Sequence, residues 1–235
     1  MSENIKEKTT KVFKVDLDSR ANQRILKPSA RPSNNQAYQV NKVAEKIDKL
    51  IRNAQYSNDG IVLNYNKIKE AFFSPFKPQL KSAQAFLLHS HADKNKALKV
   101  KGYLEEYLDT ECVFIDSLFW DYKDGVLNKL AEYDDTSKIE DAFTLILRES
   151  LQDMIEKCPY FVFLKSKNSV SLNKDLLGIT YSAWIYEELK ITHSISNKSR
   201  LTIAMESFQV SHNISPFLEH LETITLSELS HIINS

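Results

Sequence analysis

Apolar and polar positions change their spacing along the chain, and these changes divide it into three stretches. Residues 1–37 are polar and basic, include Pro28 and Pro32, and show no sustained apolar period. A segment of this composition buries too little apolar surface to offset the entropy that is lost when a chain becomes ordered. The pattern therefore predicts a flexible basic lead segment over residues 1–37.

Residues 38–82 begin with the spacing of an amphipathic α-helix. Its apolar positions are Val40, Val43, Ala44, Ile47, Leu50, Ile51 and Ala54. A stripe of basic side chains follows another face of the same helix, at Lys42, Lys46, Lys49 and Arg52. The stretch then passes through two prolines, and its aromatic residues predict a packed linker: Phe72, Phe73, Pro75, Phe76 and Pro78. We expect residues 38–82 to form a helical extension.

From residue 83 to residue 235, short apolar strands alternate with helical segments. The predicted strands cover residues 85–88, 112–115, 160–164 and 201–205. The predicted helices are one that ends near residue 108 and others over residues 139–155, 180–192 and 226–233. Ser90 and Asp93 have the spacing of a capping box at the start of the first helix. The alternation predicts an α/β fold with a flavodoxin-like, doubly wound parallel sheet, preceded by the N-terminal helical extension.

Composition and charge narrow the class of protein. The chain has 235 residues, of which 42% are hydrophobic, so it can bury a full core. Its longest apolar runs, such as residues 161–164, are far shorter than the roughly 20 residues of a membrane-spanning helix. It has four glycines and no glycine-rich phosphate-binding pattern. Two cysteines and the lack of an apolar signal region at the start lead us to expect a protein of the reducing cytosol.

The balanced net charge conceals an asymmetry between the two parts of the chain. Residues 1–82 hold 16 basic and 8 acidic side chains, whereas residues 83–235 hold 15 basic and 23 acidic ones. Such a split indicates parts with different roles or parts that attract one another. The basic stripe on residues 42–52 fits either a nucleic acid or acidic partner, or a solvated helix face. No aromatic side chains interleave with it, so we favour the solvated face and expect nucleic-acid binding to be weak at most.

One predicted helix carries aromatic and acidic side chains on a single face. Tyr181, Trp184 and Glu188 follow one another at spacings of three and four residues, which places them in line along the helix. A carboxylate in line with two aromatic side chains is unexpected, because burying an unpaired acid costs several kcal/mol. Either the stripe reaches solvent at Glu188, or Glu188 pairs with a neighbouring base, or the carboxylate has a function.

Three segments, taken together and in chain order, resemble the Toll/interleukin-1 receptor (TIR) domain family, and its bacterial members in particular. They are FLLHSHADK over residues 86–94, VFIDS over residues 113–117 with Trp120, and YSAWIYEEL over residues 181–189. In that family the first strand runs into a loop of the form (L/S)HS-x-x-D and the second ends in an I-D-S-like loop. A later helix reads S-x-W-x-x-x-E-L. The resemblance covers residues 83–235 and leaves the first 82 residues outside it.

The resemblance implies an enzyme that cleaves NAD⁺ as its substrate, without a resident cofactor or metal. Glu188, four residues after Trp184, takes the position of the family's catalytic glutamate, and Glu187 does not. The implied products are nicotinamide and a linear, cyclic or conjugated ADP-ribose. The family also implies activation through self-association of TIR domains, as in bacterial anti-phage defence, and leaves room for a sensor or effector protein encoded elsewhere.

The remaining nucleotide contacts are expected at the loops that follow the first two strands, because open α/β sheets bind ligands at the carboxyl ends of their strands. These loops cover residues 90–93 and 116–120. With the helix that carries Trp184, they give the candidate nucleotide-binding residues: Ser90, His91, Asp93, Asp116, Ser117, Trp120, Tyr181 and Trp184.

A site with one carboxylate suits this reaction. Ordinary glycosidases need two carboxyl groups because an alkoxide leaving group must be protonated. Nicotinamide leaves NAD⁺ as a neutral molecule, so no general acid is required. The remaining task is to stabilise an oxocarbenium-like ribosyl centre and to hold the ribose hydroxyls, which a single ionised glutamate can do.

Three alternative functions follow from the same residues. The first is a non-catalytic TIR scaffold, for which Glu188 is an ordinary surface residue. The second is a metal site, because residues 89–93 also read H-x-H-x-D; Lys94 stands where that zinc motif has a further histidine, so we expect no metal. The third, a phosphoacceptor receiver domain, would need an acidic pair where His89 and Ser90 stand.

Overall fold

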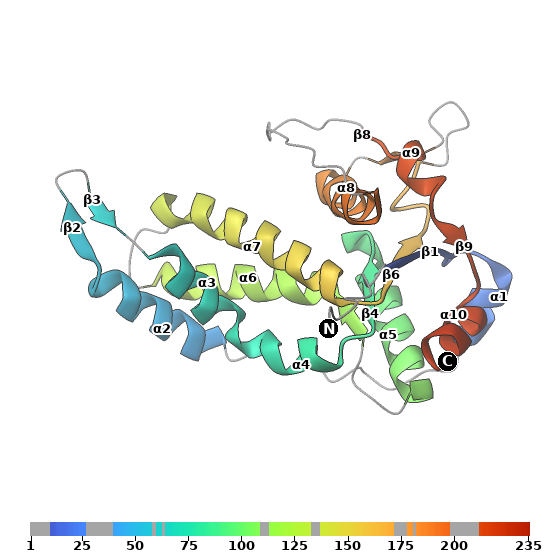
Figure 1. Cartoon of the computed structure of the whole chain (residues 1–235), viewed down its shortest axis with the longest axis horizontal. Helices are drawn as coiled ribbons and strands as arrows, with labels where there is room; N and C mark the ends of the chain where they lie inside the picture. The colour runs from blue at the N-terminus through green and yellow to red at the C-terminus, as the bar shows by residue number, and fades with distance from the viewer. Residues whose placement is uncertain are drawn as a thin grey trace, which may run out of the picture. The chain divides into compact units, whose positions relative to one another are not determined.

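The computed structural model describes residues 10–26, 40–57, 60–62, 64–108, 113–132, 137–171, 178–180, 182–197 and 212–235 (Figure 1). The chain forms two compact units. The first contains Met1–Ser33, Ala83–Asp116 and Met154–Ser235, and the second contains Asn34–Ser82 and Ser117–Asp153. Each unit therefore combines segments from distant parts of the sequence, whereas the hydrophobic pattern predicts consecutive stretches. Among the described helices, none combines the length and the apolarity that crossing a membrane requires.

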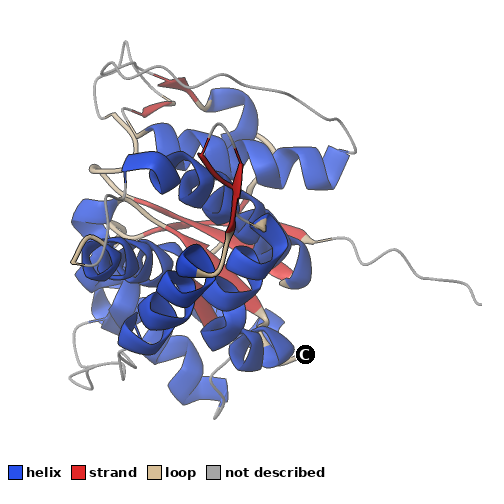
Figure 2. Ribbon diagram, turned by 90° about the vertical axis from the view of Figure 1, so that its left-hand side faces the viewer, coloured by secondary structure: helices blue, strands red, loops and turns tan. Residues whose placement is uncertain are grey.

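The first unit is built on a five-stranded sheet in the order β5-β4-β6-β1-β9. All neighbouring strands in it are parallel. The strands are β1 (Lys11–Asp16), β4 (Ala85–Leu88), β5 (Val113–Ile115), β6 (Tyr160–Lys165) and β9 (Glu222–Thr223). Figure 2 shows these strands side by side. The predicted α/β class with a parallel sheet flanked by helices is confirmed.

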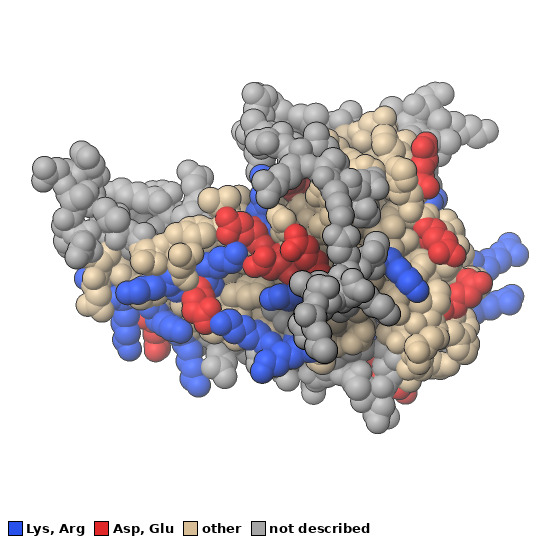
Figure 3. All heavy atoms as spheres, in the orientation of Figure 1, with Lys and Arg blue, Asp and Glu red and all other residues tan. Residues whose placement is uncertain are grey.

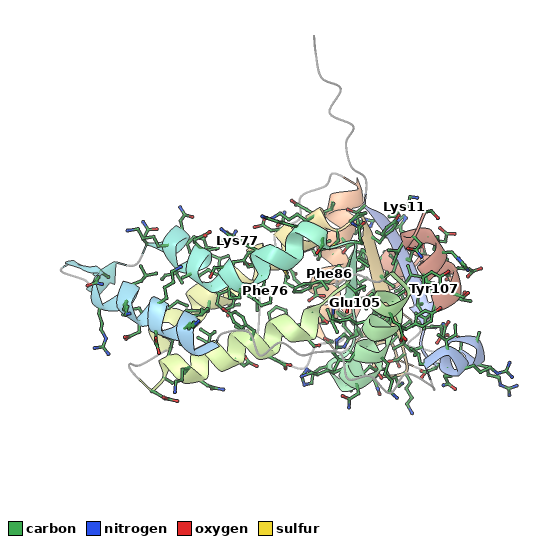
Figure 4. All side chains as sticks on the ribbon, turned by 90° about the horizontal axis from the view of Figure 1, so that it is seen from below. Lys11, Phe76, Lys77, Phe86, Glu105 and Tyr107 are labelled. Carbon is green, nitrogen blue, oxygen red and sulfur yellow. The ribbon has the colours of Figure 1, made fainter. Side chains whose placement is uncertain are left out.

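The central strands are buried on both faces, which explains why their sequences are continuously apolar. All four residues of β4 are buried, as are the four central residues of β6. Phe86, labelled in Figure 4, stacks between its neighbours, with ring centroids 5.7 Å from Phe114 and 5.9 Å from Phe161. Runs of this kind are typical of parallel strands covered by helices on both sides.

The helices of the first unit are α1 (Arg20–Leu26), α5 (Lys94–Leu108), α8 (Ala183–Asn197), α9 (Ser215–Leu218) and α10 (Leu226–Ile233). Three of them, α5, α8 and α10, correspond to predicted ones, whereas α1 and α9 were not predicted. The short strand β7 (Ile179–Thr180) precedes α8, and β8 (His212–Asn213) follows it; the two strands pair in antiparallel orientation. The strand predicted over residues 201–205 lies outside the described residues.

The strand β1 corrects the prediction that residues 1–37 form a flexible lead segment. It pairs with β6 over six residues, from Lys11 opposite Tyr160 to Asp16 opposite Lys165. Its apolar side chains Phe13 and Val15 are buried at a spacing of two residues, which is the period of a strand. Lys11 and Lys14 lie close to these apolar residues in the sequence, so the short strand pattern is difficult to recognise there. The helix α1 follows directly after the turn at Leu17 to Ser19.

The second unit is mostly helical. It contains α2 (Val40–Arg52), α3 (Tyr65–Phe73), the 3₁₀ turn η1 (Ser74–Phe76), α4 (Lys77–Ser82) and a hairpin of β2 (Gln55–Ser57) and β3 (Gly60–Val62). Most of α6 (Asp116–Leu130) and of α7 (Ser137–Lys157) belongs to it. An aromatic cluster fills its core: Phe72 lies 5.0 Å from Tyr122 and 5.4 Å from Phe143, measured between ring centroids.

The predicted amphipathic character of α2 is confirmed. Its apolar side chains Val43, Ala44, Ile47 and Ile51 are buried, whereas Lys42, Lys46, Lys49 and Arg52 are exposed. Figure 3 shows basic side chains gathered along this helix. Arg52 pairs with Asp48 one turn earlier, at 2.9 Å, so part of the stripe's charge is already offset within the helix.

Candidate functional site

The candidate site lies where the central strands of the sheet end. β4, β6 and β1 are neighbours and parallel, so the segments that follow them leave the sheet at the same edge. Ligands of open α/β folds bind at this edge. The segments are residues 89–93 after β4, residues 166–171 after β6 and residues 17–19 after β1. The first contains three of the predicted site residues.

His89 and Asp116 form a buried polar pair at the ends of β4 and β5. His89 Nε2 lies 3.0 Å from Asp116 Oδ1, and the His89 side chain is fully buried. The other ring nitrogen, Nδ1, lies 2.6 Å from the carbonyl oxygen of Ser90. His91, in contrast, is exposed. In the described part of the chain, no three metal-ligating side chains come together, so the H-x-H-x-D pattern does not form a metal cluster there.

The segment after β5 differs from the expected loop over residues 116–120. The helix α6 begins at Asp116, directly after the last residue of β5. Asp116 lies in the first turn of that helix, where a negative charge is favoured by the helix dipole. Ser117 is also buried. The side chain of Trp120 lies outside the described residues.

Asp93 is the best-connected carboxylate of the site, and its contacts correct the predicted capping box. Ser90 makes no side-chain cap; instead its carbonyl oxygen accepts a hydrogen bond from the backbone N–H of Asp93, at 2.7 Å. The Asp93 carboxylate, which is 1% exposed, faces the segment after β6. Oδ2 accepts a hydrogen bond from the Ser166 hydroxyl, and Oδ1 accepts one from Asn168 Nδ2 at 3.0 Å.

Lys96 joins this carboxylate to a second one that comes from the N-terminal strand. Its Nζ lies 3.2 Å from Asp93 Oδ1 and 3.3 Å from Asp18 Oδ1. Asp18 follows β1, and its Oδ2 accepts a hydrogen bond from the backbone N–H of Lys167 at 2.9 Å. Burial alone would raise the pKa of Asp18, but the bonds from Lys167 and Lys96 outweigh it and hold that pKa below its usual value. We call Asp18, Asp93, Lys96, Ser166 and Asn168 the three-loop cluster.

Hydrogen bonds and short stretches of backbone lead from this cluster to α8. Ser166 and Ser169 close a tight turn, in which Ser169 Oγ donates to Ser166 O at 3.0 Å and accepts from Ser166 N at 2.8 Å. Ser171 N then donates to Ile179 O at 2.8 Å, which brings the start of β7 next to that turn. Ser182 caps α8 by accepting from Ile185 N at 3.3 Å.

Glu188 lies inside the protein on α8, with no exposed surface. The stripe therefore does not reach solvent at this position, which excludes one of the interpretations of the sequence pattern. Trp184, one turn earlier on α8, is half-buried, and so is Glu187. Tyr181 lies outside the described residues.

Four members of the three-loop cluster were not predicted from the sequence. Ser166 and Asn168 belong to a polar run, SKNS, that follows β6 directly, and polar residues at the end of a buried strand are a usable signal. Asp18 was missed because β1 was not recognised as a strand. Lys96 could be predicted only as an exposed helix residue, since its two carboxylate partners come from different segments.

Comparisons with known proteins add no relative of this chain. No protein-family model matches it, no curated protein matches it, and no solved structure matches it.

Proposed function

We propose that this protein is a TIR-type enzyme that cleaves NAD⁺ at the bond between nicotinamide and ribose, with Glu188 as its catalytic carboxylate. The products are nicotinamide and an ADP-ribose species, and the setting is bacterial anti-phage signalling. The finer fold assignment, a flavodoxin-like TIR sheet, is part of the same proposal. The order β5-β4-β6 supports it. Within residues 83–235, β4 is the first strand, β5 the second and β6 the third. A flavodoxin-like sheet likewise places its first strand between its second and its third.

One observation carries the proposal. Glu188 has no exposed surface, and it lies on α8, which comes after β6 in the chain, one turn away from the indole of Trp184. A buried carboxylate has a cost, which a protein recovers either through partners or through function. In a site that excludes water, its charge acts more strongly on a developing positive centre than it would in solvent. An oxocarbenium-like ribosyl centre is such a positive centre.

Glu188 and Trp184 have different roles in this proposal. The ionised carboxylate stabilises the positive charge on the ribose as the bond to nicotinamide breaks, and it accepts hydrogen bonds from ribose hydroxyls. The indole of Trp184 forms a wall of the nicotinamide-riboside pocket. The electrons of the broken bond stay on nicotinamide, which leaves uncharged, and water or another acceptor then attacks the ribosyl carbon.

Burial of Glu188 also sets a condition for activity. NAD⁺ reaches this carboxylate only when the side chains that cover it move aside, so the described conformation is a resting one. Self-association, which the family resemblance implies, supplies a physical cause for such a movement if the assembled state exposes the site. We therefore expect activity to depend steeply on protein concentration.

Nicotinamide release from NAD⁺ by the purified protein at rising concentration tests the proposal. Glu188→Gln keeps the shape of the side chain and removes its charge, so we expect release to fall at least about 100-fold, the scale for loss of a main electrostatic stabiliser. Glu187→Gln, one position away on another azimuth, is the matched control and should retain activity. Chromatography of the ADP-ribose products then identifies the linear, cyclic or conjugated species.

Two outcomes contradict the proposal. If Glu188→Gln and Glu187→Gln release nicotinamide at the wild-type rate, Glu188 is not the catalytic carboxylate. If the wild-type protein releases none even when it is fused to an oligomerising domain, the non-catalytic scaffold becomes the better interpretation.

A further inference from the structure

We infer that Asp93 is a positioning residue, which acts through the Ser166–Ser169 turn to hold α8 in place and, with it, Trp184 and Glu188. This inference rests on the proposed function for its kinetic consequence, but its structural part stands on the contacts alone. It differs from the expectation that Asp93 touches the nucleotide.

The first step is that donors of the protein itself engage both oxygens of the buried Asp93 carboxylate. Both oxygens are engaged, Oδ2 by the Ser166 hydroxyl and Oδ1 by Asn168 Nδ2 and Lys96 Nζ. Because the carboxylate is 1% exposed, these contacts are shielded from water. Hydrogen bonds to a charged group in such surroundings are among the stronger ones in proteins.

The second step is that these bonds hold the turn over residues 166–169 in place. The Ser166 hydroxyl donates to Asp93 and at the same time accepts from the backbone N–H groups of Asn168, at 3.0 Å, and Ser169, at 3.3 Å. On the other side of the turn, the Lys167 N–H donates to Asp18. Carboxylates from the segments after β4 and β1 thus hold the segment after β6 from both sides.

The third step leads from the turn to the helix. Val170 N donates to Ser166 O at 3.1 Å, and Ser171 N donates to Ile179 O at 2.8 Å. Ser182 N donates to Thr180 Oγ1 at 3.2 Å, directly before the first turn of α8. Every link from Asp93 to the start of α8 is therefore a hydrogen bond or a short stretch of backbone. If the turn shifts, the N-terminal part of α8 shifts with it.

Hydrogen exchange measured by mass spectrometry tests the structural part. Asp93→Asn removes the charge while keeping the size of the side chain, and Ser166→Ala removes the connecting hydroxyl. In both variants we expect amides of residues 183–190 to exchange about tenfold faster, as loss of one charge-assisted hydrogen bond implies. Residues 226–233 of α10 serve as the internal reference and should exchange at the wild-type rate.

Steady-state kinetics of NAD⁺ cleavage tests the functional part. A misplaced Glu188 weakens stabilisation of the transition state more than binding of the substrate, so kcat should fall about tenfold while KM changes less than about twofold. The double variant Asp93→Asn/Ser166→Ala should lose no more than the stronger single variant, because both changes break the same link. Lys99→Met, on the exposed face of α5, is the control for a change of charge on that helix.

The possible results separate the two proposals. Wild-type exchange rates in α8 for both single variants, or losses that multiply in the double variant, overturn the positioning role. A rise in KM at constant kcat for Asp93→Asn also overturns it, since that result marks a direct contact with the substrate. If the wild-type protein cleaves no NAD⁺, the proposed function fails, and hydrogen exchange alone still decides whether Asp93 holds α8.

Discussion

His89 Nε2 lies 3.0 Å from Asp116 Oδ1, and the two residues come from the ends of neighbouring parallel strands, β4 and β5. Both imidazole nitrogens face oxygen atoms, because Nδ1 lies 2.6 Å from Ser90 O. A side chain of this kind is costly to bury unless its partners stay in place. The pair therefore fixes the two strand ends that flank the candidate site.

Asp116→Ala should lower the free energy of unfolding by about 3 kcal/mol, the scale for removing one partner of a buried polar pair. Urea denaturation followed by circular dichroism measures this change. Asp124→Ala on the same helix is the control, because its side chain is 65% exposed beside Lys123 and should cost less than about 1 kcal/mol. Equal losses for the two variants would show that the His89 contact contributes nothing.

The three-loop cluster predicts a dependence of stability on pH. The pKa of Asp18 is held below its usual value, so its ionised form is favoured in the folded state. A group of this kind contributes stability above its unfolded pKa, about 3.9, and the contribution is lost as the pH falls through the lower folded pKa. Asp18→Asn should therefore be less stable than the wild type at pH 7, and the difference should shrink as the pH falls below about 3.9.

Urea midpoints of the wild type and Asp18→Asn across that pH range measure the effect. The asparagine oxygen can still accept from Lys167 N–H, so the comparison isolates the charge. The size of the effect is modest because the Asp18 side chain is 36% exposed. A difference that stays constant from pH 7 to pH 2 would mean that the Asp18 charge plays no part.

In the helical unit, Tyr122 ties α6 to the end of α3. Its hydroxyl donates to Phe72 O at 2.8 Å, and its ring lies 4.8 Å from that of Phe76. Burial raises the pKa of Tyr122, so the hydroxyl remains a donor at any ordinary pH. Tyr122→Phe keeps the aromatic packing, removes the donor, and should destabilise the protein by about 1 to 2 kcal/mol.

Thermal or urea unfolding measures the loss in Tyr122→Phe, and Tyr122→Leu provides the comparison. The leucine variant loses both the hydrogen bond and the ring contacts, so it should be the less stable of the two. If Tyr122→Phe unfolds as the wild type does, the hydrogen bond from the Tyr122 hydroxyl adds nothing measurable to stability.

The sequence was informative where one local pattern decides the structure. The apolar runs of β4 and β6 and the periodicity of α5 and α10 persist in the fold because burial on both faces, or on one helix face, is the dominant free-energy term there. The strand β1 was missed for a local reason. Phe13 and Val15 are its buried apolar residues, and its other positions are basic, acidic or half-buried.

The site was harder to predict because its contacts join distant segments. Ser90 and Asp93 fit a capping box in the sequence, yet the Asp93 carboxylate bonds to Ser166, 73 residues away. A local motif gives no information about a competing donor from another strand. Glu188 could be singled out from its spacing to Trp184, since both lie on one helix, but its complete burial depends on tertiary packing.

Gly178 sets the geometry of the chain just before α8. Its φ is +76°, in the region that side-chain-bearing residues rarely adopt, and a Cβ placed there would overlap Ser215 Oγ. Its carbonyl oxygen also accepts from Ile214 N at 2.7 Å, next to the β7 and β8 pair. Gly178→Ala should therefore destabilise the protein by about 2 kcal/mol or more, from backbone strain and from the overlap together.

Gly125→Ala is the matched control for this substitution, because Gly125 lies inside α6, where alanine is favoured by about 0.5 to 1 kcal/mol. The two variants make the same chemical change, so opposite signs in urea denaturation would show the combined cost of backbone strain and overlap at Gly178. Hydrogen exchange of α8 should rise in Gly178→Ala alone, since His212 of β8 stacks on Tyr186 of α8 at 4.7 Å. A stable Gly178→Ala protein with wild-type exchange in α8 would show that the β7 and β8 pair does not support this helix.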